Sequence, residues 1–148
     1  MVGVSRNRCV EDEKLMTAVL EATSSNKKEL FIIDARPKVN AQANMGMGMG
    51  YEIVPSIYSN CIIEFHNIAN IHVMRDSLKK LRKLCASVNE IPKDVFRRQV
   101  ESSGWLEHIR RVLACSVRMV TLVDKEACPV LSHCKSIILV IILNIKCR

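Results

Sequence analysis

The chain has 148 residues, of which 49% are hydrophobic, 25% are charged and only 4% are aromatic. This length suits one domain, and the composition is typical of a folded protein with an aliphatic core, which excludes a disordered chain. The formal net charge of +7 favours an anionic partner, such as a nucleic acid, an acidic lipid or a phosphorylated ligand. Aromatic residues do not interleave with the basic clusters, so we do not expect a nucleic-acid partner.

Seven cysteines at irregular spacings, without a secretory signal, predict reduced thiols in the cytoplasm. No Cys-x-x-Cys pair is present, and the four histidines are not spaced as zinc ligands, so we expect neither a metal site nor another cofactor. The longest apolar run, Ile137–Leu143, has seven residues, whereas a membrane-spanning helix needs about 20. At most, the chain is expected to bind a membrane peripherally.

The first third of the chain predicts a helix, a strand and a second helix. Apolar residues at helical spacing, after three acidic residues, predict a helix over Val10–Thr23, and Ser24–Lys28 is expected to be a polar turn. Leu30–Asp34 is a short apolar run, typical of a buried strand. Pro37 can begin a short helix. The three glycines in Met45–Gly50 then predict a flexible loop or a turn.

The middle of the chain predicts a second strand at Asn60–Ile68 and two helices after it. The first helix is basic and amphipathic, and Asn89–Lys93 is expected to end it. Its inward-facing residues are predicted to be Val73, Leu78, Leu81 and Leu84, and its outward-facing ones Lys79, Lys80, Arg82 and Lys83. Ser102 or Ser103 can cap the next helix. The apolar face of that helix consists of Trp105, Ile109, Val112, Leu113, Ser116 and Val120.

The last third predicts one further strand, at Cys128–His133, and an apolar run at Ile137–Leu143. That run is either another buried strand or an aggregation-prone segment, because it is rich in β-branched residues and contains no charge, proline or glycine. Strands separated by helices predict an α/β fold. We therefore expect a short, mostly parallel sheet flanked by helices.

Several segments, in the same order and register, resemble the phosphatase domain of the myotubularin family. Asp34-Ala35-Arg36-Pro37 is similar to an Asp-Ala-Arg-Pro segment of that family, and Gly48-x-Gly50-Tyr51-Glu52 is similar to the glycine-rich turn after it. Asn70-Ile71-His72 matches an Asn-Ile-His segment, and Glu101–Ile109 resembles the segment before a long helix. Pro129–Cys134 resembles the strand that delivers the nucleophilic cysteine.

The resemblance extends from about Gly3 to Cys134. It implies a partial phosphatase domain at 1–134, with a protein tyrosine phosphatase-like layered fold, and a divergent apolar tail at 135–148. The family's membrane-binding PH-like domain has no counterpart, so Met1 is expected to be an internal position. We also expect the absence of the remaining part of the domain to leave apolar surface exposed.

The resemblance implies a cysteine-dependent phosphatase that acts on phosphatidylinositol 3-phosphate and phosphatidylinositol 3,5-bisphosphate. By position, Cys134 is the nucleophile, and Asn44, Asn70 and Ile71 line the substrate pocket. From the residues alone, Asn44 could instead cap a helix or occupy a turn, and Asn70 could be the N-cap of the helix after it. The implied partners are a phosphoinositide headgroup and other myotubularin-family subunits. The implied location is the cytoplasm, with peripheral attachment to endosomal membranes at most.

The residues after Cys134 depart from the family pattern. The family continues with Ser-Asp-Gly-Trp-Asp-Arg, whereas this chain continues with Lys135-Ser136-Ile137-Ile138-Leu139-Val140. It therefore lacks the backbone loop that cradles phosphate, the arginine that clamps its oxygens and the aspartate that transfers protons. Lys135 offers one flexible ammonium, which does not replace an organised cradle. Three roles stay open: an inactive phosphatase fragment, a non-catalytic binding or adaptor fragment, and a misfolding product.

Overall fold

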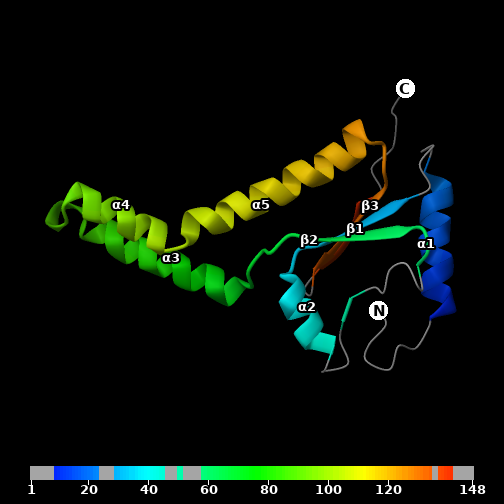
Figure 1. The fold of residues 1–148 in the computed structure, drawn as a ribbon, viewed down its shortest axis with the longest axis horizontal. Helices are drawn as coiled ribbons and strands as arrows, with labels where there is room; N and C mark the ends of the chain where they lie inside the picture. Colours follow the sequence, from blue (N-terminus) through cyan, green and yellow to red (C-terminus); the bar gives the residue numbers. More distant parts are fainter. Residues whose placement is uncertain (1–8, 24–28, 46–49, 52–57, 135–136, 142–148) are drawn as a thin grey trace. The chain divides into compact units, whose positions relative to one another are not determined.

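The computed structural model describes residues 9–23, 29–45, 50–51, 58–134 and 137–141. Contacts divide the chain into two units. The first, called the sheet unit, consists of Met1–Asn67 and Ser116–Arg148, and the second, called the helical unit, consists of Ile68–Cys115. The described strands all lie in the sheet unit (Figure 1).

The sheet has four strands in the spatial order β2-β1-β3-β4. Their bounds are Leu30–Asp34 (β1), Cys61–Phe65 (β2), Val130–Cys134 (β3) and Ile137–Ile141 (β4). β1 is parallel to β2 and to β3, whereas β4 is antiparallel to β3. The predicted α/β fold with a mostly parallel sheet is therefore confirmed.

β1 is the centre of this sheet, and all five of its residues are buried. A strand with neighbours on both edges and cover on both faces needs a continuous apolar run. Leu30 and Ile32 form a core with Tyr58 and Cys61. Helix α1 (Val10–Ala22) contributes to this core from one side (Figure 1), through Met16, Val19 and Leu20. The predicted first helix and first strand are both confirmed.

The other predicted strands are confirmed with different ends. β2 stops at Phe65 because Asn67 has a φ of 54°, a left-handed conformation that ends an extended segment. β3 begins at Val130, later than predicted, because Ala127 has a φ of 53° and Pro129 has no N–H for a ladder. The apolar tail forms β4, so its interpretation as a strand is confirmed for Ile137–Ile141.

The remaining part of the sheet unit includes helix α2 (Lys38–Met45), which begins directly after Pro37, as predicted. The carbonyl of Pro37 accepts hydrogen bonds from the N–H groups of Asn40 and Ala41, at 3.0 and 3.1 Å. The predicted turn at 24–28 and most of the glycine-rich segment, 46–49, lie outside the described residues.

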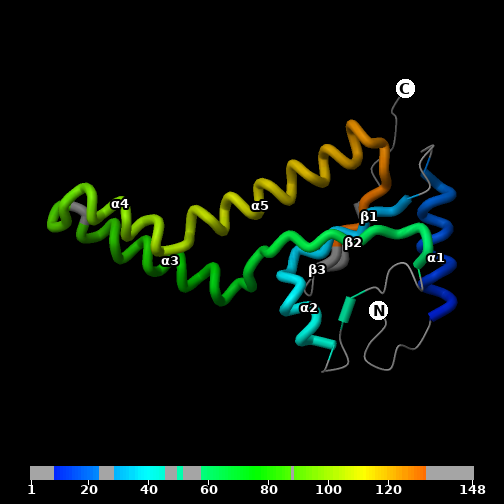
Figure 2. Tube along the Cα trace, in the orientation of Figure 1, coloured from blue at the N-terminus to red at the C-terminus, as the bar shows by residue number. Residues whose placement is uncertain are grey.

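The helical unit contains α3 (Ile71–Ala86), a short 3₁₀ turn (Val88–Glu90), α4 (Lys93–Ser102) and the first part of α5 (Trp105–Val120). The chain runs from α3 through the 3₁₀ turn into α4, which lies beside α3 (Figure 2). The sequence did not predict α4. None of the described helices has the length and apolar character needed to cross a membrane.

The predicted faces of these helices are only partly correct. On α3, Leu84 is buried and Leu78 and Leu81 are half-buried, but Val73 is 48% exposed, so its predicted inward position is wrong. The ten-residue α4 is shorter than the sixteen-residue α3 and does not cover the first turn, where Val73 lies. On α5, the predicted apolar face is largely exposed, and Cys115 is the buried residue.

Candidate active site

The candidate site lies at the carboxyl edge of the parallel strands. In the β1–β3 pairing, Asp34 is opposite His133, which places Cys134 one residue further along the same edge. β1 lies between β2 and β3, so the chain leaves β1 toward one neighbour and returns later to the other side. In open α/β sheets, ligands bind at the carboxyl ends of strands where the strand order reverses in this way.

Asp34 and Arg36 form a clasp at this edge. The Asp34 side chain is fully buried, and its carboxylate accepts hydrogen bonds from the Arg36 backbone N–H at 2.9 Å, from Nε at 2.9 Å and from Nη2 at 2.6 Å. Arg36 Nη2 also donates to the Gly50 carbonyl at 2.9 Å. A buried carboxylate needs such partners. Arg36 therefore links Gly50, which follows α2 in the chain, to the end of β1. Its guanidinium group makes this link.

The predicted site residues fall in both units. Cys134 is the last residue of β3, and Asn44 is a half-buried residue in the last turn of α2, so these two belong to the sheet unit. Asn70 and Ile71 begin α3 in the helical unit. Ile71 is 60% exposed. The role of each residue in substrate binding stays a prediction.

Asn70 is the N-cap of α3, which confirms one of its predicted roles. Its Oδ1 accepts hydrogen bonds from the N–H groups of His72 and Val73, both at 3.0 Å. These two groups belong to the first turn of the helix, where N–H groups have no partner within the helix. The cap uses only the oxygen of the amide, and Nδ2 has no part in it.

The backbone of Ile137–Ile141, close after Cys134, has the geometry of a strand. Cys134 pairs with Ile137, and Leu131 pairs with Val140, in the antiparallel ladder between β3 and β4. In such a ladder, the N–H groups point alternately to the two sides of the strand. A phosphate cradle needs successive N–H groups that converge on one point. The described part of this segment, Ile137–Ile141, therefore does not have the geometry of a cradle.

A second polar cluster in the sheet unit is centred on Arg118, at the end of α5. Its Nε and Nη2 donate to the Glu64 carboxylate at 3.0 and 2.7 Å, and its Nη1 donates to Glu126 at 2.6 Å. The guanidinium carbon lies 5.5 Å from the centre of the Phe31 ring. The hydrogen bonds from Arg118 lower the pKa of Glu64, although burial of this carboxyl acts in the opposite direction. His66 Nε2 is 3.7 Å from Glu64 Oε2.

This cluster was not predicted from the sequence. Arg118 and Glu64 are 54 residues apart, and neither lies in a motif. The cluster joins the end of α5 and the turn after it to the edge strand β2, through Glu64, and to the neighbouring strand β1, through Phe31. A π-helical turn, Thr121–Lys125, follows α5 and precedes Glu126. We infer a structural role, because all three nitrogens of the guanidinium donate to carboxylates.

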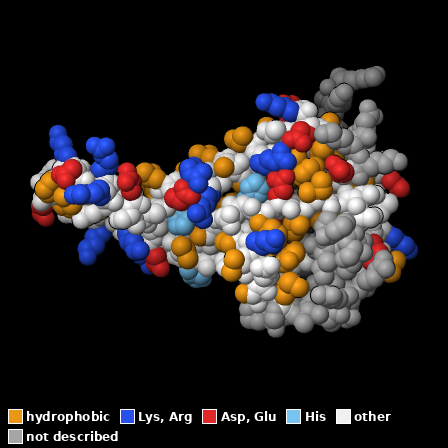
Figure 3. All heavy atoms as spheres, viewed as in Figure 1, with side chains coloured by type: hydrophobic (Ala, Val, Ile, Leu, Met, Phe, Trp, Pro, Cys, Tyr) orange, Lys and Arg blue, Asp and Glu red, His pale blue; other side chains and the backbone are white. Residues whose placement is uncertain are grey.

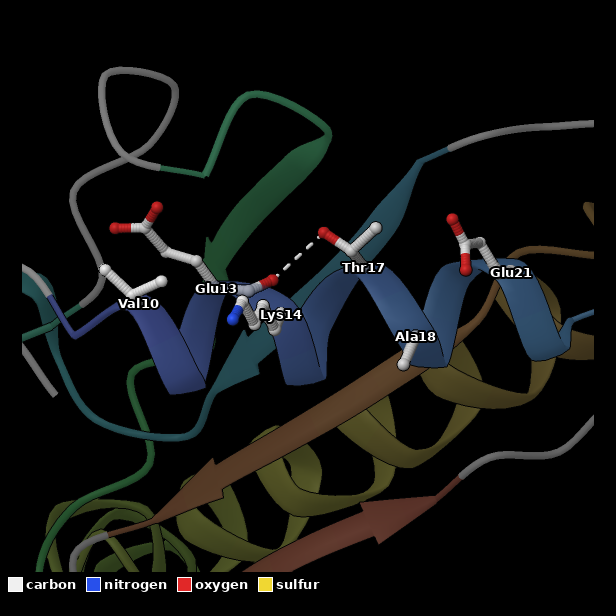
Figure 4. Close-up of a pocket in the computed structure, with 6 residues that line it drawn as sticks. All are labelled: Val10, Glu13, Lys14, Thr17, Ala18 and Glu21. Atoms are coloured by element: carbon white, nitrogen blue, oxygen red, sulfur yellow. Dashed lines mark hydrogen bonds between the residues drawn. The ribbon is translucent and has the colours of Figure 1, made fainter.

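The surface hollow along α1 does not offer a comparable site. Its lining residues come from one helix and include Glu13, Lys14, Thr17 and Glu21. The Thr17 hydroxyl donates to the Glu13 carbonyl at 3.0 Å (Figure 4). In the part of the chain that the structure describes, no three His, Cys, Asp or Glu side chains are grouped so that they could hold a metal ion.

Comparison with known proteins identifies the family. A family model described as the myotubularin-like phosphatase domain matches residues 1–137. The phosphatidylinositol-3,5-bisphosphate 3-phosphatase mtm-1 of Caenorhabditis elegans is 42% identical over 134 residues, which are 90% of this chain and 22% of that protein. The phosphatidylinositol-3,5-bisphosphate 3-phosphatase MTMR8 of Gallus gallus is 42% identical over 127 residues, covering 86% of this chain and 20% of that protein.

A third relative, the phosphatidylinositol-3-phosphate phosphatase MTMR7 of Homo sapiens, is 39% identical over 127 residues, covering 86% of this chain and 19% of that protein. The chain thus spans about a fifth of the length of the curated relatives that it matches. The family match covers nearly all of the sheet and helical units just described. This chain belongs to the myotubularin family.

Proposed function

We propose that this chain is a myotubularin-type fragment that recognises 3-phosphorylated phosphoinositide headgroups but does not hydrolyse them. The observation that carries this proposal is the position of Cys134. It ends β3 at the carboxyl edge of the sheet, and β4 begins three residues later. The cysteine thus has a place that suits a nucleophile, and the sequence after it lacks the residues of a phosphate-binding loop.

The expected chemistry of a complete site explains why this matters. A thiolate sulfur attacks phosphorus, the bond from phosphorus to the inositol oxygen breaks, and that oxygen takes a proton from an acid. Water then attacks phosphorus, the bond from phosphorus to sulfur breaks to release the thiolate, and a base takes the proton of the water. In both steps the transition state spreads its negative charge over the three equatorial phosphate oxygens, which a complete site stabilises with organised donors. Removing one such donor can slow a reaction by about 10²–10³-fold, so the loss of a whole cradle leaves no useful turnover.

Headgroup recognition can persist without turnover because it uses other residues. Asn44, Asn70 and Ile71 are the candidates. Asn70 Oδ1 is committed to the cap of α3, which leaves its Nδ2 as the donor for an inositol hydroxyl or a phosphate oxygen. The net charge of +7 supports an anionic ligand. We further propose a cytoplasmic chain that reaches endosomal membranes through this ligand.

An adaptor role is the second candidate. The observation that favours it is the exposed apolar face of α5, where Val112 and Leu113 are 37% and 60% exposed. Apolar side chains gathered on one helix face are typical of a surface that binds another protein. Other myotubularin-family subunits are the proposed partners for this role.

Two measurements test these proposals. Phosphate release from phosphatidylinositol 3-phosphate should be the same for the chain and for Cys134→Ser, and release that Cys134→Ser abolishes would overturn the proposed inactivity. Flotation with vesicles should show retention on phosphatidylinositol 3-phosphate above that on phosphatidylinositol. Equal retention on both lipids would overturn headgroup recognition. Size-exclusion chromatography with a full-length relative tests the adaptor role, and the absence of co-elution would contradict it.

A further inference from the structure

The helical unit carries most of the net positive charge of the chain. Residues 68–115 include ten Lys and Arg residues against five Asp and Glu residues. Lys and Arg side chains gather over α3 and α4 (Figure 3). Part of this charge surrounds a surface hollow between the two helices, with a volume of about 460 Å³.

The hollow combines cationic groups with an apolar floor. Lys80 and Lys83 reach it from α3, and Gln99 reaches it from α4. Leu84, which is only 8% exposed, and Ile91 supply the apolar contacts. Three serines complete the lining, and no carboxylate is among the described lining residues. An anion placed here would therefore not meet a like charge on the wall.

The two lysines are one helical turn apart and have no ion-pair partner among the described residues. Two other cations of these helices do form ion pairs: Lys79 Nζ is 3.2 Å from Asp76, and Arg98 Nη2 is 3.0 Å from Asp94. Residues at a spacing of three lie on the same side of a helix, so the ammonium groups of Lys80 and Lys83 can converge on one ligand. Each ammonium offers three donors.

The serine hydroxyls do not compete for this role as donors. Ser102 Oγ donates to the Gln99 carbonyl at 3.0 Å, and Ser103 Oγ donates to the Val100 carbonyl at 2.6 Å. The donors left for a ligand are the two ammonium groups and the Gln99 amide. Together they suit a compact oxyanion with about two negative charges. A phosphate monoester has this charge and several strong acceptor oxygens.

We propose that the hollow between α3 and α4 binds a phosphate monoester group through Lys80 and Lys83, with Gln99 as a third donor. Leu84 and Ile91 would contact the carbon atoms next to the phosphate. The same chemistry is present in a soluble phosphate ester and in a lipid headgroup. This inference does not depend on Cys134 or on the proposed function of the sheet edge.

The test compares two probes and two matched variants. Glycerol 3-phosphate is titrated into the isotopically labelled chain at low salt, with the backbone amide signals followed by NMR. Phosphatidylcholine vesicles that contain phosphatidic acid are used in flotation. The Lys80→Gln/Lys83→Gln variant removes two charges from the hollow, and Lys79→Gln/Lys93→Gln removes two charges outside it. Circular dichroism checks that both variants remain folded.

We expect the amides of Leu84 and Gln99 to shift with the soluble probe, and binding to weaken by tenfold or more in Lys80→Gln/Lys83→Gln, since two hydrogen bonds from charged groups would be lost. The control variant should bind within about twofold of the parent chain. Binding to both probes would indicate a site for the phosphate ester itself, and binding to vesicles alone would indicate a lipid site. Binding to neither probe, or an equal loss in the two variants, would overturn the proposal.

Discussion

Replacing Arg118 with Met tests whether the cluster of Arg118, Glu64 and Glu126 holds the end of α5 against the sheet. Methionine keeps an unbranched apolar stem but removes the guanidinium. Two carboxylates, whose side chains are 27% and 32% exposed, would lose their partner. The contact of the cation with the Phe31 ring would be lost as well.

The expected loss follows from these contacts. An exposed ion pair contributes about 0.2–1 kcal/mol, whereas breaking a buried pair costs about 3–5 kcal/mol. The Arg118 pairs are about one-third exposed, so we place each near 1 kcal/mol, and the cation–ring contact adds about 0.5–1 kcal/mol. The free energy of unfolding should therefore fall by about 2–3 kcal/mol. For a domain of this size, that corresponds to a melting temperature lower by roughly 4–12 °C.

Urea denaturation followed by circular dichroism measures this loss, and Arg98→Met is the control. Arg98 and Asp94 also form an ion pair, at 3.0 Å, but both side chains are 73% exposed. Arg98→Met should change the free energy of unfolding by less than about 0.5 kcal/mol. If Arg118→Met costs no more than Arg98→Met, then the cluster does not stabilise the sheet unit and the reasoning from burial is wrong.

Three further predictions concern pH, a helix cap and two backbone conformations. Hydrogen bonds from Arg118 hold the pKa of Glu64 below its ordinary value of 4.5, so the stabilisation is present above about pH 4.5 and is lost as the pH falls through the lowered pKa. The free energy of unfolding should therefore fall on acidification, and Arg118→Met should flatten this dependence; an unchanged slope would contradict the assignment. Asn70→Ala should lower the free energy of unfolding by about 1 kcal/mol through loss of the α3 cap. Asn70→Asp should keep that stability yet weaken retention on phosphatidylinositol 3-phosphate vesicles, and normal retention would show that Nδ2 has no role. Ala127→Gly should raise the free energy of unfolding by about 1 kcal/mol, because Ala127 has a φ of 53°. Gly104→Ala should lower it by about 1 kcal/mol through its φ of 76°, since an added Cβ would meet no atom closer than 3.9 Å. If Ala127→Gly and Gly104→Ala both melted at the temperature of the parent chain, the left-handed backbone at these positions would not be strained.

The parts of the fold that could be predicted are those in which one segment carries its own pattern. The continuous apolar run of β1 predicted a buried strand because a central parallel strand must be apolar on both faces. Asn70 predicted the start of α3 because a short polar side chain there accepts the free N–H groups. Helix α4 was missed because its ten residues are mostly charged or polar and follow Pro92 directly.

The parts that could not be predicted depend on distant partners. The helical spacing of α5 revealed an apolar face, but spacing alone does not say whether another element covers it, and Leu113 is 60% exposed. The pairing of Arg118 with Glu64 is formed across 54 residues and has no local signal. For the candidate site, the resemblance placed Cys134 at the end of a strand, and the structure agrees. The hydrogen bond from Arg36 to the Gly50 carbonyl spans 14 residues and has no local signal in the sequence.

The pairing of β1 with β3 also bears on how this chain acquires its structure. Phe31 pairs with Val130, roughly a hundred residues later, whereas β1 and β2 join after a much shorter loop. Contacts between distant segments form slowly, so we expect β1 and β2 to pair early and β3 to join them last. Until then, one edge of the buried strand β1 offers unpaired N–H and C=O groups to any neighbouring chain. The edge of β1 that pairs with β3 is thus the last part of the parallel sheet to be covered and the part most open to aggregation during synthesis.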